Sequence, residues 1–202
     1  MRLTGILLAA GRSRRFGADK RLAALPNGEP LVLCCARNLR AALDDVLVVL
    51  RPGDAALAEQ LAVLDCRVTH NPDAAEGMGA SIRHGVGQRP GSDGWLILPA
   101  DLPLLRTDTV RQVAAALQDW PAVVPVCQGR RGHPVGFSAR YREGLLGLGG
   151  DEGARRLLEA EPEKVRWLAV DDPGICRDVD TPAALRAALH GQGAGPGGPA
   201  AG

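Results

Sequence analysis

Short, almost continuous apolar runs alternate with longer amphipathic segments along this chain, and that alternation limits the folds it can adopt. Runs such as "VLVVL" and "WLIL" are typical of strands that are covered on both faces, as in parallel sheets. Alternating strands and helices predict an α/β, doubly wound sheet. The predicted strands are Thr4–Ala9, Asp45–Leu50, Arg67–His70, Trp95–Pro99, Ala122–Val126, Pro134–Ser138 and Val165–Val170.

The segments between the strands repeat apolar residues at helical spacing. "PLVLCCARNLRAAL" begins at Pro30, a favourable first-turn residue, and we expect Thr107 or Asp108 to cap the helix in "TDTVRQVAAALQD". "DEGARRLLEAE" and "TPAALRAALH" show the same pattern. We expect one Rossmann-like, three-layer domain with a mostly parallel sheet over residues 1–190. The tail 191–202 consists almost entirely of Gly, Ala and Pro, and we expect it to be disordered.

Composition excludes several classes of function. The formal net charge of +1 and the aromatic fraction of 3% argue against partnership with nucleic acid or with a membrane surface. No apolar run approaches the roughly 20 residues of a membrane helix, and the N-terminal run is too short for a signal peptide. The five cysteines form no C-x-x-C pair, so we expect reduced thiols in a cytoplasmic protein, with a redox or metal role as the alternative.

The loop after the first predicted strand is rich in positive charge. It lies in "ILLAAGRSRRFGADKRL", and ligands of open α/β sheets bind beyond the carboxyl ends of strands. Neither the dinucleotide fingerprint G-x-G-x-x-G nor a Walker A motif is present. Small residues around Gly11 allow a close approach to backbone N–H groups, Arg15 can bind phosphate through two N–H groups, and Lys20 is one of only two lysines. This loop suits a triphosphate whose leaving group is pyrophosphate; the alternative is an ordinary solvated loop.

A second chemical signal follows the strand in "DGWLILPADLPLL". Asp101 stands at the carboxyl end of that strand, where a carboxylate can meet a hard cation and a ligand together. Mg²⁺ is usually held by one or two carboxylates and by substrate phosphates, so one Asp is sufficient. We expect Asp101 to bind Mg²⁺, with a turn or capping role as the alternative.

The order L-A-A-G-x-S-x-R-F-G-x-x-K resembles the signature of nucleotidyltransferases, and most of all that of the molybdenum cofactor cytidylyltransferases and their molybdopterin-guanine relatives. The resemblance implies a nucleotidyltransferase-type fold in which this loop wraps a nucleoside triphosphate. Arg15 and Lys20 would then neutralise the phosphates as catalytic residues. Ala10 is typical of the cytidylyl branch, because the guanylyl branch more often reads L-A-G-G. The loop residues that would contact the nucleotide are Leu8, Ala9, Ala10, Gly11, Arg12 and Lys20.

Downstream segments extend the resemblance to about residues 3–190. The G-M-x-x-S pattern in "NPDAAEGMGASIRHGV" implies a base pocket formed by Gly77, Met78 and Ser81, with Asn71 in a matching place; ordinary turn glycines are the alternative. A glycine-rich entry to a helix also exposes N–H donors.

Three residues are expected on the acceptor side. His133 lies in "GRRGHPVGF", and Asp151 and Arg155 lie in "GLGGDEGARRLL", both similar to family elements near the acceptor. A loop histidine and an N-capping Asp151 are the alternatives. In "CRDVDTPAAL" the resemblance implies a second metal carboxylate, for which we favour Asp180 over Asp178, with helix capping as the alternative.

Together these expectations describe an Mg²⁺-dependent transfer of CMP from CTP to the phosphate of molybdenum-bearing molybdopterin. A client molybdoenzyme or its chaperone would be a further partner. The alternatives are a guanylyltransferase on the same cofactor, a transferase that uses a sugar or polyol phosphate, and a non-catalytic cofactor carrier. The absent glycine fingerprint disfavours a dinucleotide-dependent oxidoreductase.

Overall fold

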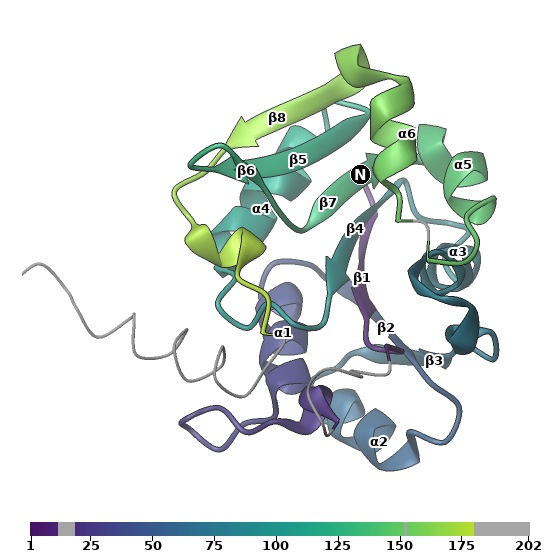
Figure 1. Cartoon of the computed structure of the whole chain (residues 1–202), viewed down its shortest axis with the longest axis vertical. Helices are drawn as coiled ribbons and strands as arrows, with labels where there is room; N and C mark the ends of the chain where they lie inside the picture. Colours follow the sequence, from purple (N-terminus) through teal and green to yellow (C-terminus); the bar gives the residue numbers. More distant parts are fainter. Residues whose placement is uncertain (12–18, 152, 180–202) are drawn as a thin grey trace, which may run out of the picture.

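An eight-stranded sheet organises the computed structural model, which describes residues 1–11, 19–151 and 153–179. Its strand order is β3-β2-β1-β4-β7-β5-β6, and β8 also pairs with β5 (Figure 1). The predicted helix "TPAALRAALH" and the tail 191–202 lie outside the described residues. The strands are β1 (Leu3–Leu8), β2 (Asp45–Leu50), β3 (Arg67–His70), β4 (Gly94–Pro99), β5 (Ala122–Cys127), β6 (Arg130–Arg131), β7 (Val135–Ser138) and β8 (Val165–Ala169).

The sheet is mixed but mostly parallel, as predicted. Strands β1 to β4 are parallel to one another and β8 is parallel to β5, whereas β7 is antiparallel to both of its neighbours, β4 and β5. The short strand β6 was not predicted. It forms a hairpin with β5 through Gln128 and Gly129, which both have positive φ, as a tight two-residue turn requires.

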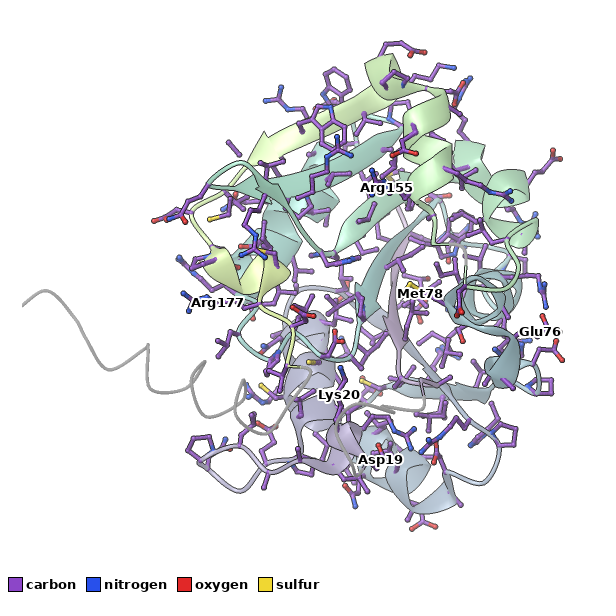
Figure 2. All side chains as sticks on the ribbon, viewed as in Figure 1. Asp19, Lys20, Glu76, Met78, Arg155 and Arg177 are labelled. Carbon is purple, nitrogen blue, oxygen red and sulfur yellow. The ribbon has the colours of Figure 1, made fainter. Side chains whose placement is uncertain are left out.

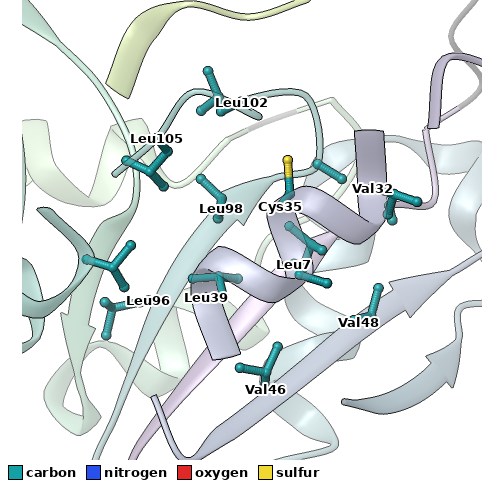
Figure 3. Close-up of a cluster of buried hydrophobic side chains, with 14 of the residues drawn as sticks. Leu7, Val32, Cys35, Leu39, Val46, Val48, Leu96, Leu98, Leu102 and Leu105 are labelled. Atoms are coloured by element: carbon teal, nitrogen blue, oxygen red, sulfur yellow. The ribbon is translucent and has the colours of Figure 1, made fainter. Parts of the chain in front are cut away.

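Helices cover both faces of the sheet, which gives the predicted three layers (Figure 1). The core on one face joins the sheet to α1 (Leu31–Arg40), α2 (Ala55–Val63) and α4 (Thr107–Ala116), and Figure 3 shows part of it. The core on the other face joins the sheet to α3 (Met78–Gly87), α5 (Arg142–Leu146) and α6 (Arg155–Ala160). Short 3-10 helices are η1 (Lys20–Leu22), η2 (Ala74–Glu76), η3 (Ala139–Tyr141), η4 (Pro162–Lys164) and η5 (Pro173–Cys176).

Successive strand residues serve opposite cores, which explains the continuous apolar runs. In β4, Leu96 and Leu98 face the α1 side, whereas Trp95 and Ile97 face the α3 side. Because side chains alternate between the two faces of a strand, a strand covered on both sides needs apolar residues throughout.

None of the helices in the described part of the chain combines the length and hydrophobicity that a bilayer crossing requires.

The start of α4 differs from the prediction. Neither Thr107 nor Asp108 caps it: the N-cap is Arg106, which makes no side-chain capping bond. Instead the buried carboxylate of Asp172 accepts hydrogen bonds from the backbone N–H of Arg106 at 2.9 Å and from the hydroxyl of Thr109 at 2.7 Å. The expected local cap was wrong, and the acceptor at this end of α4 is a residue distant in sequence.

Candidate nucleotide site at the carboxyl ends of β1 and β4

Strands β1 and β4 end side by side at the point where the chain order of the sheet reverses. Leu8, the last residue of β1, pairs with Pro99, the last residue of β4. A crevice at such a switch point is where open α/β sheets bind ligands. Here it is a cavity of about 440 Å³, lined by Leu8, Ala9, Ala10, Gly11, Lys20, Arg21, Ala74, Ala75, Gly77, Met78, Ser81, Pro99, Ala100, Asp101 and Asp151.

Lys20 and Asp101 meet in this cavity although 81 positions separate them in sequence. Lys20 Nζ donates to Asp101 Oδ2 at 2.9 Å, and the two side chains are 13% and 23% exposed. Figure 2 shows Lys20 beyond the ends of β1 and β4. The backbone of Asp101 also accepts a hydrogen bond from the N–H of Val179 at 3.0 Å, which brings the segment of Asp178 beside it. The cavity thus holds a cation and a carboxylate that both remain partly open to a ligand.

Arg21 ties the two ends of the first loop together. Its side chain is 4% exposed and donates to the carbonyl of Ala9 at 2.8 Å, to Asp19 through Nε at 2.8 Å, and to Asp54 through Nη2 at 2.9 Å. Further bonds from Nη1 to Asp54 and from Nη2 to Asp19 complete the set, so every N–H of the guanidinium has a partner. Arg51 also donates to Asp19.

Sequence reasoning missed this role of Arg21. Phosphate contacts were expected from Arg15 and Lys20, with a solvated loop as the alternative, and no role was assigned to Arg21. In the structure the guanidinium of Arg21 lies between the carboxylates of Asp19 and Asp54. The guanidinium of Arg21 is also the largest cause that lowers the pKa of Asp19, to about 2. The sequence does carry one signal for this role: in "DKR" an aspartate and an arginine directly flank Lys20.

The far wall of the cavity is formed by two loops packed on each other. The N–H of Gly79 donates to the carbonyl of Gly150 at 2.9 Å, so one of the helix-entry donors expected for a ligand is already bonded. Gly77 has φ of 128°, and a Cβ there would come within 2.3 Å of Asp151 Oδ1. Only glycine therefore fits this contact without a shift of the neighbouring loop.

Asn71, His133 and Arg155 do not line the cavity. Asn71 is fully buried and donates to Ser81 Oγ at 3.3 Å, so it supports a lining residue rather than a ligand. Arg155 is 78% exposed and pairs with Glu159 one turn along α6. The α6 helix begins after Ala154 without a side-chain capping bond, so the capping alternative for Asp151 was wrong.

His133 is not part of the cavity lining, although it is close enough to Asp101 to interact with its charge. Its backbone N–H donates to Ile175, its Nδ1 is buried with no hydrogen-bond partner in the described part of the chain, and burial lowers the pKa of its ring. A ring with a lowered pKa is mostly neutral at pH 7, so His133 adds little positive charge for an anionic acceptor. The predicted residues Arg12, Arg15 and Asp180 lie outside the described residues.

The donor set of the cavity fits a hard divalent cation. Asp101 supplies a partly exposed carboxylate, and no cluster of three or more His, Cys, Asp or Glu suited to a metal occurs among residues 1–11, 19–151 and 153–179. A single protein carboxylate with phosphate and water oxygens is an arrangement that Mg²⁺ accepts and Zn²⁺ rarely does. A cation here would therefore depend on the nucleotide for most of its ligands.

Comparisons with known proteins agree with this geometry. The crystal structure of Rv0371c from Mycobacterium tuberculosis H37Rv superposes with a TM-score of 0.79 at 27% identity, covering 94% of this chain and 99% of that one. A second structure of that protein, at 26% identity and a TM-score of 0.75, is described as a complex with manganese. The fold is that of the nucleotidyltransferases.

The family is shown by sequence. Residues 5–167 match the MobA-like NTP transferase domain, and the chain belongs to that family. It is 34% identical over 195 residues to the purine catabolism protein PucB of Bacillus subtilis, with 89% of this chain and 92% of that protein covered. It is 29% identical to the nicotine blue oxidoreductase of Paenarthrobacter nicotinovorans, covering 89% and 92%. It is 30% identical to a protein of Chloroflexus aggregans named "Probable molybdenum cofactor guanylyltransferase", covering 72% and 68%.

Proposed function

We propose that this nucleotidyltransferase transfers CMP from CTP to the phosphate of molybdenum–molybdopterin and releases pyrophosphate. The observation that carries the nucleotide part is the pairing of Lys20 with Asp101, at 2.9 Å, in the cavity where β1 and β4 end. The choice of CTP rests on Ala10 in the L-A-A-G motif. The choice of acceptor rests on the resemblance to the molybdopterin nucleotidyltransferases.

The reaction would be an in-line displacement at the α-phosphorus of CTP. An oxygen of the acceptor phosphate forms the new P–O bond, and the bond from the α-phosphorus to the bridging oxygen breaks, so pyrophosphate leaves with the electron pair. Because the attacking phosphate oxygen is already anionic, the mechanism needs no general base. Catalysis then depends on positioning and on balancing negative charge.

Each residue has a defined task in this proposal. Lys20 donates to phosphate oxygens and balances the charge that develops on pyrophosphate, and Arg15 is proposed for the same task. The backbone from Leu8 to Gly11 lies close enough to the cavity to contact the phosphates. Asp101 would hold Mg²⁺, which when bound supplies positive charge to the phosphate oxygens. Asp180 is the proposed second carboxylate, and its chain neighbour Val179 bonds to the backbone of Asp101.

Nucleotide binding can be tested by thermal unfolding. We expect CTP with Mg²⁺ to raise the melting temperature by several degrees, because a ligand at 100 times its Kd adds about 2.7 kcal/mol of stability. The panel is CTP, GTP, ATP, UTP and NADH, each with Mg²⁺ or with EDTA. A shift with GTP alone would keep the mechanism and reverse the base, whereas a shift with NADH alone would contradict nucleotidyl transfer.

The metal role of Asp101 can be tested by turnover. We expect Asp101→Asn to lower pyrophosphate release from CTP and the pterin acceptor by about a hundredfold or more, because the amide is a poor Mg²⁺ ligand. Asp65→Asn is the control, since Asp65 is 84% exposed and bonds to Arg40 away from the cavity. A rate for Asp101→Asn within a few fold of wild type would show that this role is wrong.

Two other functions have their own signatures. A guanylyltransferase would use GTP with the same acceptor, as the name of the Chloroflexus aggregans relative states for that protein. A non-catalytic carrier would bind the pterin tightly without Mg²⁺-dependent turnover. We also propose a cytoplasmic location, supported by five free cysteines of which four are buried, and a client molybdoenzyme or its chaperone as partner.

A further inference from the structure

The placement of Asp151 in the cavity differs from the acceptor-side role expected for it. Its loop is anchored on the start of α3, through the bond from Gly79 to Gly150 and through Arg83, whose Nη1 donates to the carbonyl of Leu148 at 3.1 Å. Asp151 Oδ1 lies against Gly77, in the part of the wall that also contains Met78. Asp151 is therefore held on the side of the cavity formed by the α3 loop.

The side chains of Asp151 and Met78 limit which part of a ligand can lie beside them. Among the described residues Asp151 makes no side-chain hydrogen bond or ion pair, and it is exposed to the cavity. An ionised carboxylate only accepts hydrogen bonds. It would repel a phosphate, whereas the side chain of Met78, 45% exposed beside it, offers apolar surface of the kind on which a flat ring can rest. A ligand group at this position must be apolar in its body and carry N–H donors at its edge.

We propose that Asp151 reads the nucleobase by accepting a hydrogen bond from its exocyclic amino group. This inference rests on the proposed function, and it names the substrate class as triphosphates of amino-bearing bases. Cytosine presents an amino donor at N4, where uracil presents a carbonyl acceptor, and a carboxylate pairs with the first and opposes the second. Guanine carries its amino group at N2, where hypoxanthine has none.

Matched nucleotide pairs isolate this contact. Affinities of the full chain for CTP, UTP, GTP and ITP are measured by calorimetry with Mg²⁺, because each pair differs at the position of the amino group. We expect wild type to prefer CTP to UTP, or GTP to ITP, by about tenfold or more. In Asp151→Asn the ratio of the two affinities in the preferred pair should fall to within about threefold of unity, because an amide both donates and accepts hydrogen bonds.

Asp73→Asn is the matched control. Asp73 lies in the segment before α3 and pairs with Arg83, but it does not line the cavity, so its loss should leave the ratio unchanged. An unchanged ratio in Asp151→Asn would overturn the proposal. Equal weakening of both members of a pair would also overturn it, since ribose or structural roles would act on both. A wild type that binds no triphosphate would instead contradict the proposed function itself.

Discussion

Lys20 stands between two residues of a partly buried ion network, in which Arg21 is buried and Asp19 is partly exposed. Asp19 on one side and Arg21 on the other are bonded to each other, and Arg21 also bonds to Ala9 and Asp54. Removing one partner of such a partly buried set is costly, because the remaining charges lose their compensation. The network therefore determines where the backbone of Lys20 can lie, and with it the distance to Asp101.

Replacement of Arg21 tests this dependence. We expect Arg21→Lys to lose about 2–4 kcal/mol of unfolding free energy, because an ammonium cannot bond two carboxylates and a carbonyl in the same planar geometry. Affinity for Mg²⁺–CTP should fall by about tenfold or more, as measured by urea unfolding and calorimetry. Arg89→Lys is the control, since Arg89 makes a two-bond contact with Asp45 outside the cavity. Equal affinities in the two variants would contradict the positioning role.

The same network predicts an acid limit of stability. Asp19 has its pKa lowered from 3.8 to about 2 in the folded chain, chiefly by the hydrogen bond from Arg21. A lowered folded pKa contributes stability that is present above the unfolded pKa and is lost as the pH falls through the folded pKa. Between about pH 4 and pH 2 the melting temperature should therefore fall more steeply in wild type than in Asp19→Asn. If the melting temperatures of wild type and Asp19→Asn fell equally over this pH range, the prediction would be wrong.

At the scale of elements, the helices and strands depend on partners from distant parts of the chain. At the start of α4, Asp172, which follows β8, accepts hydrogen bonds from Arg106 and Thr109. The start of α3 is packed against Gly150 and Asp151. Asp172 also accepts from the N–H of Gly174 at 2.9 Å and so shapes η5. A single buried carboxylate thereby joins a helix on one face to the segment that leads back to Asp101.

Removing the carboxylate of Asp172 should lower the free energy of unfolding. We expect Asp172→Ala to cost about 2–4 kcal/mol, because three donors lose their acceptor in a buried place. Asp108→Ala, at a residue that is 67% exposed and was expected to cap the same helix, should cost less than about 0.5 kcal/mol. Denaturant unfolding measures both values, and similar losses in the two variants would contradict the assignment of Asp172 as the distant cap.

At the scale of the whole molecule, one sheet separates two hydrophobic cores and supports both. Leu39 of α1 belongs to one core and Ile82 of α3 to the other, and both are buried. Strands contribute alternate residues to each core, so loss of either core removes half of the packing of the same sheet. The two faces should unfold together.

Large-to-small substitutions on opposite faces test that cooperativity. We expect Leu39→Ala and Ile82→Ala each to cost about 2–5 kcal/mol, and their double variant to show nearly the sum, since the sheet lies between the sites. Urea unfolding followed by far-UV circular dichroism and by tryptophan fluorescence should give one coincident transition. Separate transitions for the two probes would contradict a single cooperative unit.

Most of the fold could be predicted because its signals are local. The predicted strands match the observed ones to within one or two residues. In Asp45–Leu50 and Gly94–Pro99 the reason is that burial on both faces leaves a continuous apolar run. The strand β6 was missed because two exposed arginines carry no such pattern. In the site, Lys20, Asp101, Gly77, Met78 and Ser81 were predicted, and all line the cavity.

The sequence alone determined the alternation of strands and helices, the apolar faces and the family signature, because these depend on spacing along a short stretch of backbone. Only the tertiary structure decided which groups meet: Arg21 with Asp54, Asp172 with α4, and Asp151 with Gly77. Each of these contacts joins residues that the strand order brings together. Strand order follows from the free energy of packing the whole sheet between two layers of helices, which no short segment encodes by itself.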